Sequence, residues 1–466
     1  MTDSEFSGDN GGTDARTLVF RHATVVSVDP AVGTVRDTDV LVVGDSIAAI
    51  GVGLAVPEGT REIDASGGIL MPGMIDTHRH MYQTALRGFG ADWTLTDYFY
   101  FYYINHGHHF RPQDVYAGNL LAAVESLDSG VTTTLDWSHG LRTVEYGEAA
   151  VAALQAVPGR FVFAYGNFSG SPADWATTPE FRAFARQRAE QQTDMLSFAL
   201  AFDVQGDPSF PERAGFEAAR ELDVPVTTHS GVWGATSDAG IDLIAENGFL
   251  TDRVTHVHAG TLSPESYRKI AAAGGSVSLS AESEASAGQG YLPGFRARNY
   301  GINVSLSVDT SSWWSADMFS AMRATANADR GTEHAEAHAA GETVTSLSTR
   351  VTDLVEFATI GGAAAIGRTD LVGSITVGKK ADLVLVKNDA SPTLFPILNP
   401  EGHLVFQAGR GDVHTVLVNG RVVKHEGKLL LDAQLAEARS AVAETVDYLQ
   451  SVIGDEAWNV SERPAR

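Results

Sequence analysis

Eight short apolar segments recur through the middle of this 466-residue chain, and most are separated by about the length of one helix. Runs rich in β-branched and aromatic residues that alternate with helical stretches are typical of parallel strands. Eight such units predict a (β/α)₈ barrel of the TIM type, an α/β fold. The first segment ends at His78, and the others are VTTTLD (131–136), FVFAYG (161–166), LSFALAFD (196–203), VPVTTH (224–229), RVTHVH (253–258), SVSLS (276–280) and INVSLSVD (302–309).

Strand-like sequence also lies at both ends of the chain. We expect one small β-sandwich domain assembled from residues 16–70 and 374–435, with the barrel formed by residues 71–373 between them. Residues 1–15 are polar and acidic with one aromatic side chain, so they predict a disordered lead. Residues 436–466 predict a C-terminal helical tail.

The composition narrows the chemistry available to such a barrel. The chain has no cysteine, which excludes disulfides, thiolate metal sites and a cysteine nucleophile, so a metal ion must be held by histidine and carboxylate. The net charge of −25 argues against nucleic acid and anionic membranes as partners. There is no apolar run of about 18 residues and no signal-like N-terminus. We therefore expect a cytoplasmic protein that acts on a small molecule.

Metal-binding residue types follow several of the predicted strands. His78 and His80 end the first, and residues two apart in a strand project to the same face. His229 ends the fifth strand, His258 the sixth and Asp309 the eighth. Active sites of these barrels lie at the carboxyl ends of the strands. Imidazoles with one carboxylate form a hydrolytic metal set, because a bound ion lowers the pKa of water and polarises a carbonyl.

Three further features allow two interpretations each. His256 shares the alternation of His258, although His258 lies nearer the end of the strand. His139, just past the second strand, either contacts substrate or is a satisfied buried histidine. The aromatic segment 93–110, which begins with Trp93, either forms a lid over an apolar substrate or packs between subunits.

Longer motifs connect these residues to a known family. They are PGMIDTHRH, QTALRG, SGVTTTLDWSH, VHAGTLSPES, SVDTSSWWSADMF and ATIGGAAAIGRTDLVGSITVGKKADLVLV. Through these motifs, which extend over nearly the whole chain, the sequence resembles the amidohydrolase superfamily. The resemblance is to the branch that contains triazine hydrolases and cytosine deaminases.

The resemblance implies one divalent metal ion held by His78, His80, His229 and Asp309. Zn²⁺ is the first expectation, and Co²⁺, Mn²⁺ and Fe²⁺ also suit this donor set. His258 would orient the attacking water or the substrate carbonyl. The resemblance also implies a homodimer or homotetramer.

The sequence departs from this branch at two places. Its deaminases carry a glutamate three residues after the histidine of the fifth strand, where this chain has Val232 in HSGVW. After the seventh strand the chain reads SLSAESEASAGQG, so Glu282 and Glu284 either act on substrate or cap a helix. Gln83, in QTALRG, is a further candidate substrate contact, together with His139 and Trp93. LSFALAFD lacks the lysine that relatives with two metal ions carbamylate, which favours one ion.

Three functions remain open on this basis. The leading expectation is hydrolysis of a non-peptide carbonyl compound, namely an amide, urea, carbamate or thiocarbamate. The THRH motif with paired glutamates is similar to bacterial hydrolases of phenylurea and thiocarbamate herbicides. The alternative is a heterocycle aminohydrolase or dechlorinase in which Glu282 or Glu284 carries the proton. A catalytically inactive binding protein is the third, although none of the expected ligands is missing.

Overall fold

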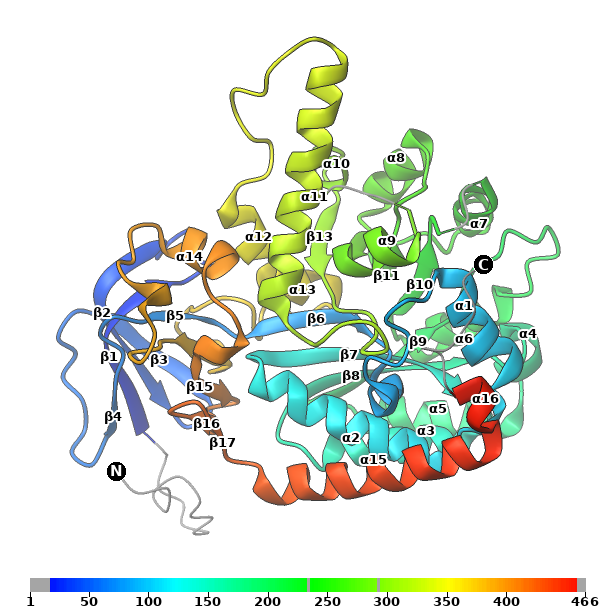
Figure 1. Ribbon diagram of the computed structural model, residues 1–466, viewed down its shortest axis with the longest axis horizontal. Helices are drawn as coiled ribbons and strands as arrows, with labels where there is room; N and C mark the ends of the chain where they lie inside the picture. The colour runs from blue at the N-terminus through cyan, green and yellow to red at the C-terminus, as the bar shows by residue number, and fades with distance from the viewer. Residues whose placement is uncertain (1–16, 233–234, 291–293, 459–466) are drawn as a thin grey trace.

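The computed structural model describes residues 17–232, 235–290 and 294–458, which form a barrel and a separate β-sheet (Figure 1). The predicted lead, residues 1–15, lies outside these ranges. None of the helices within them is long and apolar enough to cross a membrane.

The barrel contains the eight predicted strands in chain order, each parallel to the next. A bridge between Arg79 and Asp309 joins the first strand to the segment after the last. The predicted barrel is confirmed. The strands are β6 (Met74–Arg79), β7 (Val131–Leu141), β8 (Arg160–Asn167), β9 (Leu196–Ala201), β10 (Val226–Ser230), β11 (Val254–His258), β12 (Ser276–Leu279) and β13 (Asn303–Leu306).

Apolar and hydroxyl side chains fill the inside of the barrel. Ile75, Leu135 and Val257 belong to one buried cluster there. Thr77 Oγ1 lies 2.7 Å from Ser278 Oγ and 2.8 Å from Ser305 Oγ, so these buried hydroxyls satisfy one another. The barrel is therefore a packed scaffold that holds the ends of its strands in fixed positions.

Helices follow the strands and cover the outside of the barrel (Figure 1). Local sequence sets their ends, as α8 illustrates: Ser263 accepts a hydrogen bond from the Ser266 N–H, Pro264 is the first residue, and Gly274 ends the helix with φ +74°. The longer helices are α2 (Pro112–Asp128), α3 (Val144–Gln155), α5 (Pro179–Glu190), α6 (Arg213–Leu222), α7 (Ala235–Glu246), α8 (Pro264–Ala273), α11 (Met318–Ala339) and α15 (Asp432–Ile453). Shorter ones are α1 (Leu95–Phe99), α4 (Pro172–Trp175), α9 (Ala281–Ala287), α10 (Gly294–Asn299), α12 (Val351–Phe357), α13 (Ile360–Ala365), α14 (Pro400–Phe406) and α16 (Asp455–Trp458).

Both ends of the chain meet in the second sheet, as predicted. Its order is β17-β16-β15-β14-β5-β1-β2-β3, with β4 beside β1, and the antiparallel pair β5 and β14 joins the two halves. Phe20, Val40 and Leu385 belong to its core. The strands are β1 (Thr17–Val26), β2 (Thr34–Val43), β3 (Ser46–Gly51), β4 (Arg61–Asp64), β5 (Ile69–Pro72), β14 (Leu383–Val386), β15 (Val413–Val418), β16 (Arg421–His425) and β17 (Lys428–Leu429). The domain boundaries stay a prediction.

Two segments lie outside the regular βα pattern. Between β6 and α2 the chain forms η2 (Met81–Leu86), α1, a π-helical turn η3 (Tyr100–Asn105) and η4 (Gly107–His109), which contain the aromatic segment. At the C-terminus α15 lies along α2 (Figure 1). Two further 3₁₀ turns, η5 (Pro392–Leu394) and η6 (Arg410–Asp412), lie between β14 and β15.

Candidate metal centre

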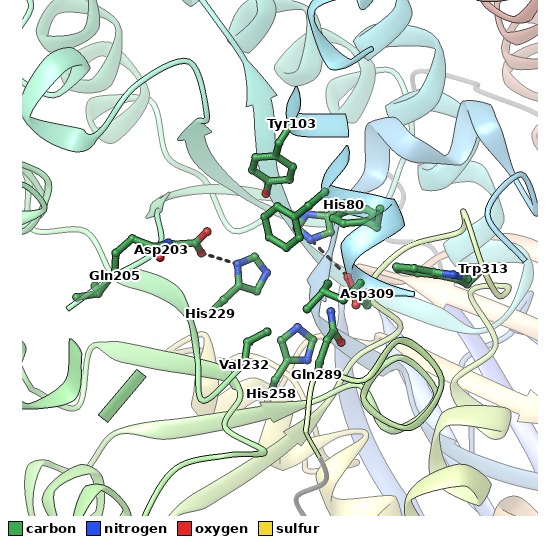
Figure 2. Close-up of a pocket in the computed structure, with 14 residues that line it drawn as sticks. His80, Tyr103, Asp203, Gln205, His229, Val232, His258, Gln289, Asp309 and Trp313 are labelled. Carbon is green, nitrogen blue, oxygen red and sulfur yellow. Dashed lines mark hydrogen bonds and ion pairs between the residues drawn. The ribbon is translucent and has the colours of Figure 1, made fainter. Parts of the chain in front are cut away.

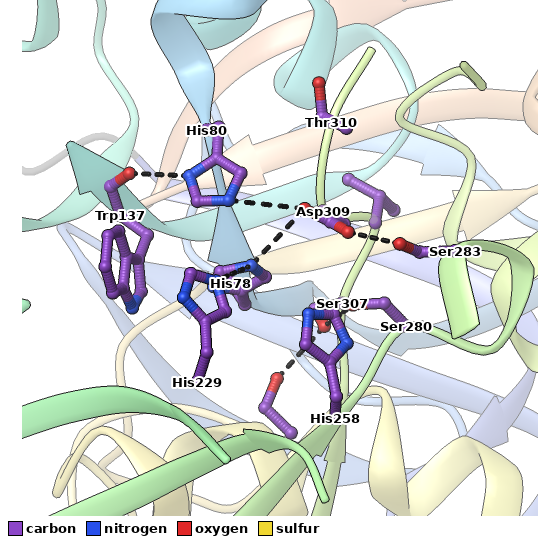
Figure 3. A network of polar contacts seen from close by, with 12 residues as sticks. His78, His80, Trp137, His229, His258, Ser280, Ser283, Ser307, Asp309 and Thr310 are labelled. Carbon is purple, nitrogen blue, oxygen red and sulfur yellow. Dashed lines mark hydrogen bonds and ion pairs between the residues drawn. The ribbon is translucent and has the colours of Figure 1, made fainter. Parts of the chain in front are cut away.

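Four histidines and one aspartate meet at the carboxyl end of the barrel (Figure 3). His78 lies in β6 and His80 directly after it, while His229 and His258 lie in β10 and β11. Asp309 follows β13. The five predicted residues therefore come together from four strands.

Asp309 lies between the two histidines of the first strand. Its Oδ1 is 3.4 Å from His78 Nε2 and 3.4 Å from His80 Nε2, and its Oδ2 accepts a hydrogen bond from Ser283. On the other side His229 Nε2 is 3.3 Å from His78 Nε2. Two groups, His78 with His229 and His258, and His78 with His80 and Asp309, each place their ligand atoms within 4.8 Å of one another.

His80 and His229 are each oriented by a hydrogen-bond partner at Nδ1. His80 Nδ1 is 2.9 Å from the carbonyl oxygen of Trp137, and His229 Nδ1 is 2.6 Å from Asp203 Oδ1. These contacts leave Nε2 of His80 facing Asp309 and Nε2 of His229 facing His78. An imidazole held at one nitrogen with the other free is typical of a metal ligand.

The protonation states suit a cation. Burial lowers the pKa of His78 well below its usual range and that of His80 to about 4, so both rings are neutral at pH 7. Burial alone would raise the pKa of Asp309, but its contact with His78 holds that pKa well below the usual range. Neutral imidazoles around an ionised carboxylate fit a divalent metal ion.

Three residues at this site have a strained backbone conformation. His258, Ala259 and Asp309 have φ of +69°, +59° and +59°, in the left-handed region that residues other than glycine avoid. Such conformations persist where the surrounding structure fixes them, often at functional sites. Here they occur at the end of β11 and just after β13.

A cavity opens above the histidines and contains about 580 Å³ of space not filled by protein atoms (Figure 2). We call it the histidine cavity. Tyr98, Phe99 and Tyr103 from the aromatic segment line it opposite Val232 and Gln289. The inner face of the aromatic segment is therefore a wall of the cavity. On its outer face Tyr100 and Ile104 are exposed, so the segment's part in subunit packing stays a prediction.

The predicted substrate contacts lie at different depths. His139 packs edge-on against His80, with ring centroids 4.1 Å apart. Gln83 is buried behind it, where its amide donates to the hydroxyl oxygen of Tyr98 at 2.8 Å. Trp93 packs on Phe101 within the aromatic segment and does not line the histidine cavity.

The two glutamates of α9 face different surroundings. Glu284 is buried, and its Oε1 lies 3.3 Å from His258 Nδ1. Glu282 is partly exposed; burial raises its pKa to about 7, with Asp317 and Arg323 as its charged neighbours. Glu284 is therefore the member of the pair that contacts the candidate centre.

The structure also separates His256 from His258. His256 Nδ1 is 3.0 Å from Ser230 Oγ, and His256 does not line the histidine cavity. His258 lines the cavity, and its Nε2 has no hydrogen-bond partner among the described residues.

Sequence reasoning did not single out Asp203, Ser283 or Gln289. Asp203 follows the fourth strand, so the rule that placed the other residues at strand ends could have found it. Ser283 and Gln289 lie in and after α9, and their sequence gives no comparable signal.

Comparison with known proteins agrees with this geometry. A sequence model of the amidohydrolase family matches residues 69–423. The chain belongs to the amidohydrolase family. This amidohydrolase is 26% identical to 5'-deoxyadenosine deaminase of Methanosarcina mazei over 93% of its own length and 99% of the relative's.

Solved structures share the fold. The TM-score is 0.76 against an adenosine deaminase from Xanthomonas campestris with bound zinc, at 23% identity over 93% of this chain and 98% of that one. It is 0.75 against atrazine chlorohydrolase from Arthrobacter aurescens complexed with zinc, at 21% identity over 91% of this chain and 100% of that one.

Proposed function

We propose that this amidohydrolase hydrolyses a C–N or C–S bond of a non-peptide carbonyl compound: an amide, urea, carbamate or thiocarbamate. The observation that carries the proposal is Val232, an apolar wall residue three positions after His229, where deaminases of this branch have a glutamate. Ring deamination requires protonation of the heterocycle. Attack on a carbonyl requires only that the proton of the water reaches the leaving group.

We assign one divalent ion to His78, His80, His229 and Asp309. When bound, it would supply an acidified water and polarise the carbonyl. Zinc is the first candidate because two related folds contain it.

The protein side chains then move one proton. Asp309 takes it from the attacking water and returns it to the leaving nitrogen or sulfur. His258 is oriented by the contact of its Nδ1 with Glu284, and its Nε2, which has no partner among the described residues, can donate a hydrogen bond to the carbonyl oxygen. The products are an acid and a neutral amine or thiol, so atoms and charge balance.

A heterocycle aminohydrolase is the second candidate. It is favoured by the relatives, which include 5'-deoxyadenosine deaminase, and by Glu284, a buried carboxyl group beside His258. Burial raises the pKa of Glu284, so it can hold a proton for a ring nitrogen.

A substrate panel decides between the two. Zinc-loaded protein is incubated with ureas, carbamates, thiocarbamates, amides and aminoheterocycles, and amine, thiol and ammonia are measured separately, with Asp309→Asn as the blank. We expect amine or thiol from the carbonyl compounds. Ammonia from the heterocycles alone would overturn the proposal in favour of the aminohydrolase.

A further inference from the structure

A second cavity adjoins the histidine cavity, and we call it the side chamber. It is open to solvent and, with that open space included, contains about 710 Å³ not filled by protein atoms. It extends from Tyr103 and Asp203 to Phe168 and Glu212. Tyr103, Asp203 and Gln205 line both cavities. Figure 2 shows these three residues along one side of the histidine cavity. A substrate whose reacting group lies at the histidines can therefore extend a second group past these three residues into the side chamber.

The side chamber is acidic. Glu212 has 2% of its surface exposed, and its Oε1 accepts a hydrogen bond from the Gln205 N–H at 3.1 Å. Its Oε2 has no partner in the described part of the chain. Asp203 supplies a second carboxylate, and none of the described lining residues is a lysine or arginine. A buried carboxylate oxygen without a donor is costly, so the site calls for a ligand that donates to it.

Aromatic rings form much of the remaining wall. Tyr103, Trp137, Phe168 and Phe202 line the side chamber, and their faces carry negative potential. Phe168 already makes one cation–π contact, because the Arg142 guanidinium lies 5.4 Å from its ring centroid. Arg142 lines a neighbouring cavity and not the side chamber.

We propose that the side chamber binds an ammonium group of the substrate, so that this enzyme prefers carbonyl compounds with an amine-bearing chain. The proposal deepens the proposed function and rests on it. An ammonium group donates to Glu212 Oε2 and faces the rings at the same time. A neutral hydroxyl would satisfy the carboxylate alone, and an anionic group would meet Glu212 and Asp203 with like charge.

Direct binding tests the chamber without catalysis. Butylammonium and butan-1-ol are titrated into zinc-loaded protein by calorimetry. We expect butylammonium to bind about tenfold tighter than the alcohol, as one charge-assisted hydrogen bond with a cation–π contact provides. Glu212→Gln, which keeps the shape and the Gln205 contact, should abolish this preference. Glu217→Gln, which removes an exposed carboxylate on α6, the helix that Glu212 caps, is the matched control and should retain it.

Two results overturn the proposal: equal affinity of both probes for the parent protein, or an equal effect of the two glutamine variants, which would mean attraction by the overall negative charge. Thermal melting shows whether Glu212→Gln folds. If it does not, Phe168→Leu replaces it, and it should weaken butylammonium binding several-fold while leaving the alcohol unchanged.

Catalysis separates this proposal from the proposed function. The kcat/KM values are compared for a monoacetylated diamine and for an N-alkylacetamide of equal length. We expect preference for the charged amide in the parent protein and its loss in Glu212→Gln. Hydrolysis of both at equal rates would overturn the side-chamber proposal alone. Hydrolysis of none of the carbonyl compounds in the substrate panel, together with selective butylammonium binding, would overturn the proposed function alone.

Discussion

Replacing Asp203 by asparagine tests the candidate metal centre through a residue that need not bind the ion. Asp203 follows β9, and its Oδ1 lies 2.6 Å from His229 Nδ1. This contact fixes which nitrogen of His229 carries the proton and leaves Nε2 free, 3.3 Å from His78 Nε2. Asparagine can still accept the hydrogen bond, but without charge.

The geometry sets the expected magnitude. Loss of a partner that orients a ligating histidine typically lowers metal affinity by about 10- to 100-fold. The side chains of His229 and Asp203 are 16% and 25% exposed, so water screens part of the interaction. We therefore expect the lower end, about a tenfold weaker affinity, which corresponds to about 1.4 kcal/mol.

The assay is a competition titration. Metal-free protein and a chelator of known affinity share limiting zinc, and the bound fraction is compared for the parent and Asp203→Asn. Asp207→Asn is the control, because Asp207 lies in the same connection but is exposed and contacts the Ser209 N–H. Unchanged affinity in Asp203→Asn, or the same loss in Asp207→Asn, would refute the reasoning.

Three further predictions concern other parts of the site. Asp309→Asn should lower kcat by at least about 100-fold, because the proton acceptor is lost; ordinary turnover would contradict the role of Asp309, and zinc titration would show whether affinity also falls. Arg79→Met should lower the free energy of unfolding in urea by about 3 kcal/mol, since Arg79 is fully buried and pairs with Glu125 at 2.5 Å. Arg87 pairs with the same carboxylate, but its side chain is 39% exposed, so Arg87→Met should cost less than about 1 kcal/mol. Equal losses of stability in the two variants would contradict the argument that burial sets the size of the effect. Burial raises the pKa of Glu282 to about 7, so the folded protein keeps a proton that the unfolded chain releases, and stability falls as pH rises from 4.5 to 7. Glu282→Gln should therefore stabilise the protein by about 3 kcal/mol at pH 8 and by little at pH 4, and a pH-independent effect would contradict this.

The barrel and its ligand-bearing strand ends were predictable because each depends on local sequence. Strand periodicity and turn residues mark β6, β10 and β11 directly, and the carboxyl ends of parallel strands must meet at one face. The same rule favours His258 over His256 as the site residue, because His258 is the last residue of β11. Such features need no knowledge of distances between distant parts of the chain.

The partners of the ligands could not be predicted in this way. The contact between Asp203 and His229 depends on the spacing of two strands and on a rotamer, neither of which the sequence shows. The side chamber depends on how β7 and the connections after β8 and β9 pack on the aromatic segment. Glu212 is buried, and one of its carboxylate oxygens has no partner among the described residues. In the sequence nothing distinguishes it from other acidic residues near the start of a helix.

Closure of the barrel and assembly of the candidate metal centre are one structural event. The Asp309 N–H donates to the His78 carbonyl oxygen at 3.0 Å, and the His80 N–H donates to the Asp309 carbonyl oxygen at 2.8 Å. These bonds join the first strand to the segment after the last, and they place the Asp309 carboxylate between the two imidazoles. The buried side chain of Arg79, between the two histidines in sequence, pairs with Glu125 on α2 and so ties the same strand to the outer helices. An ion that bound His78, His80 and Asp309 would therefore join the two ends of the barrel as well as activate water, and its removal should lower the stability of the whole fold.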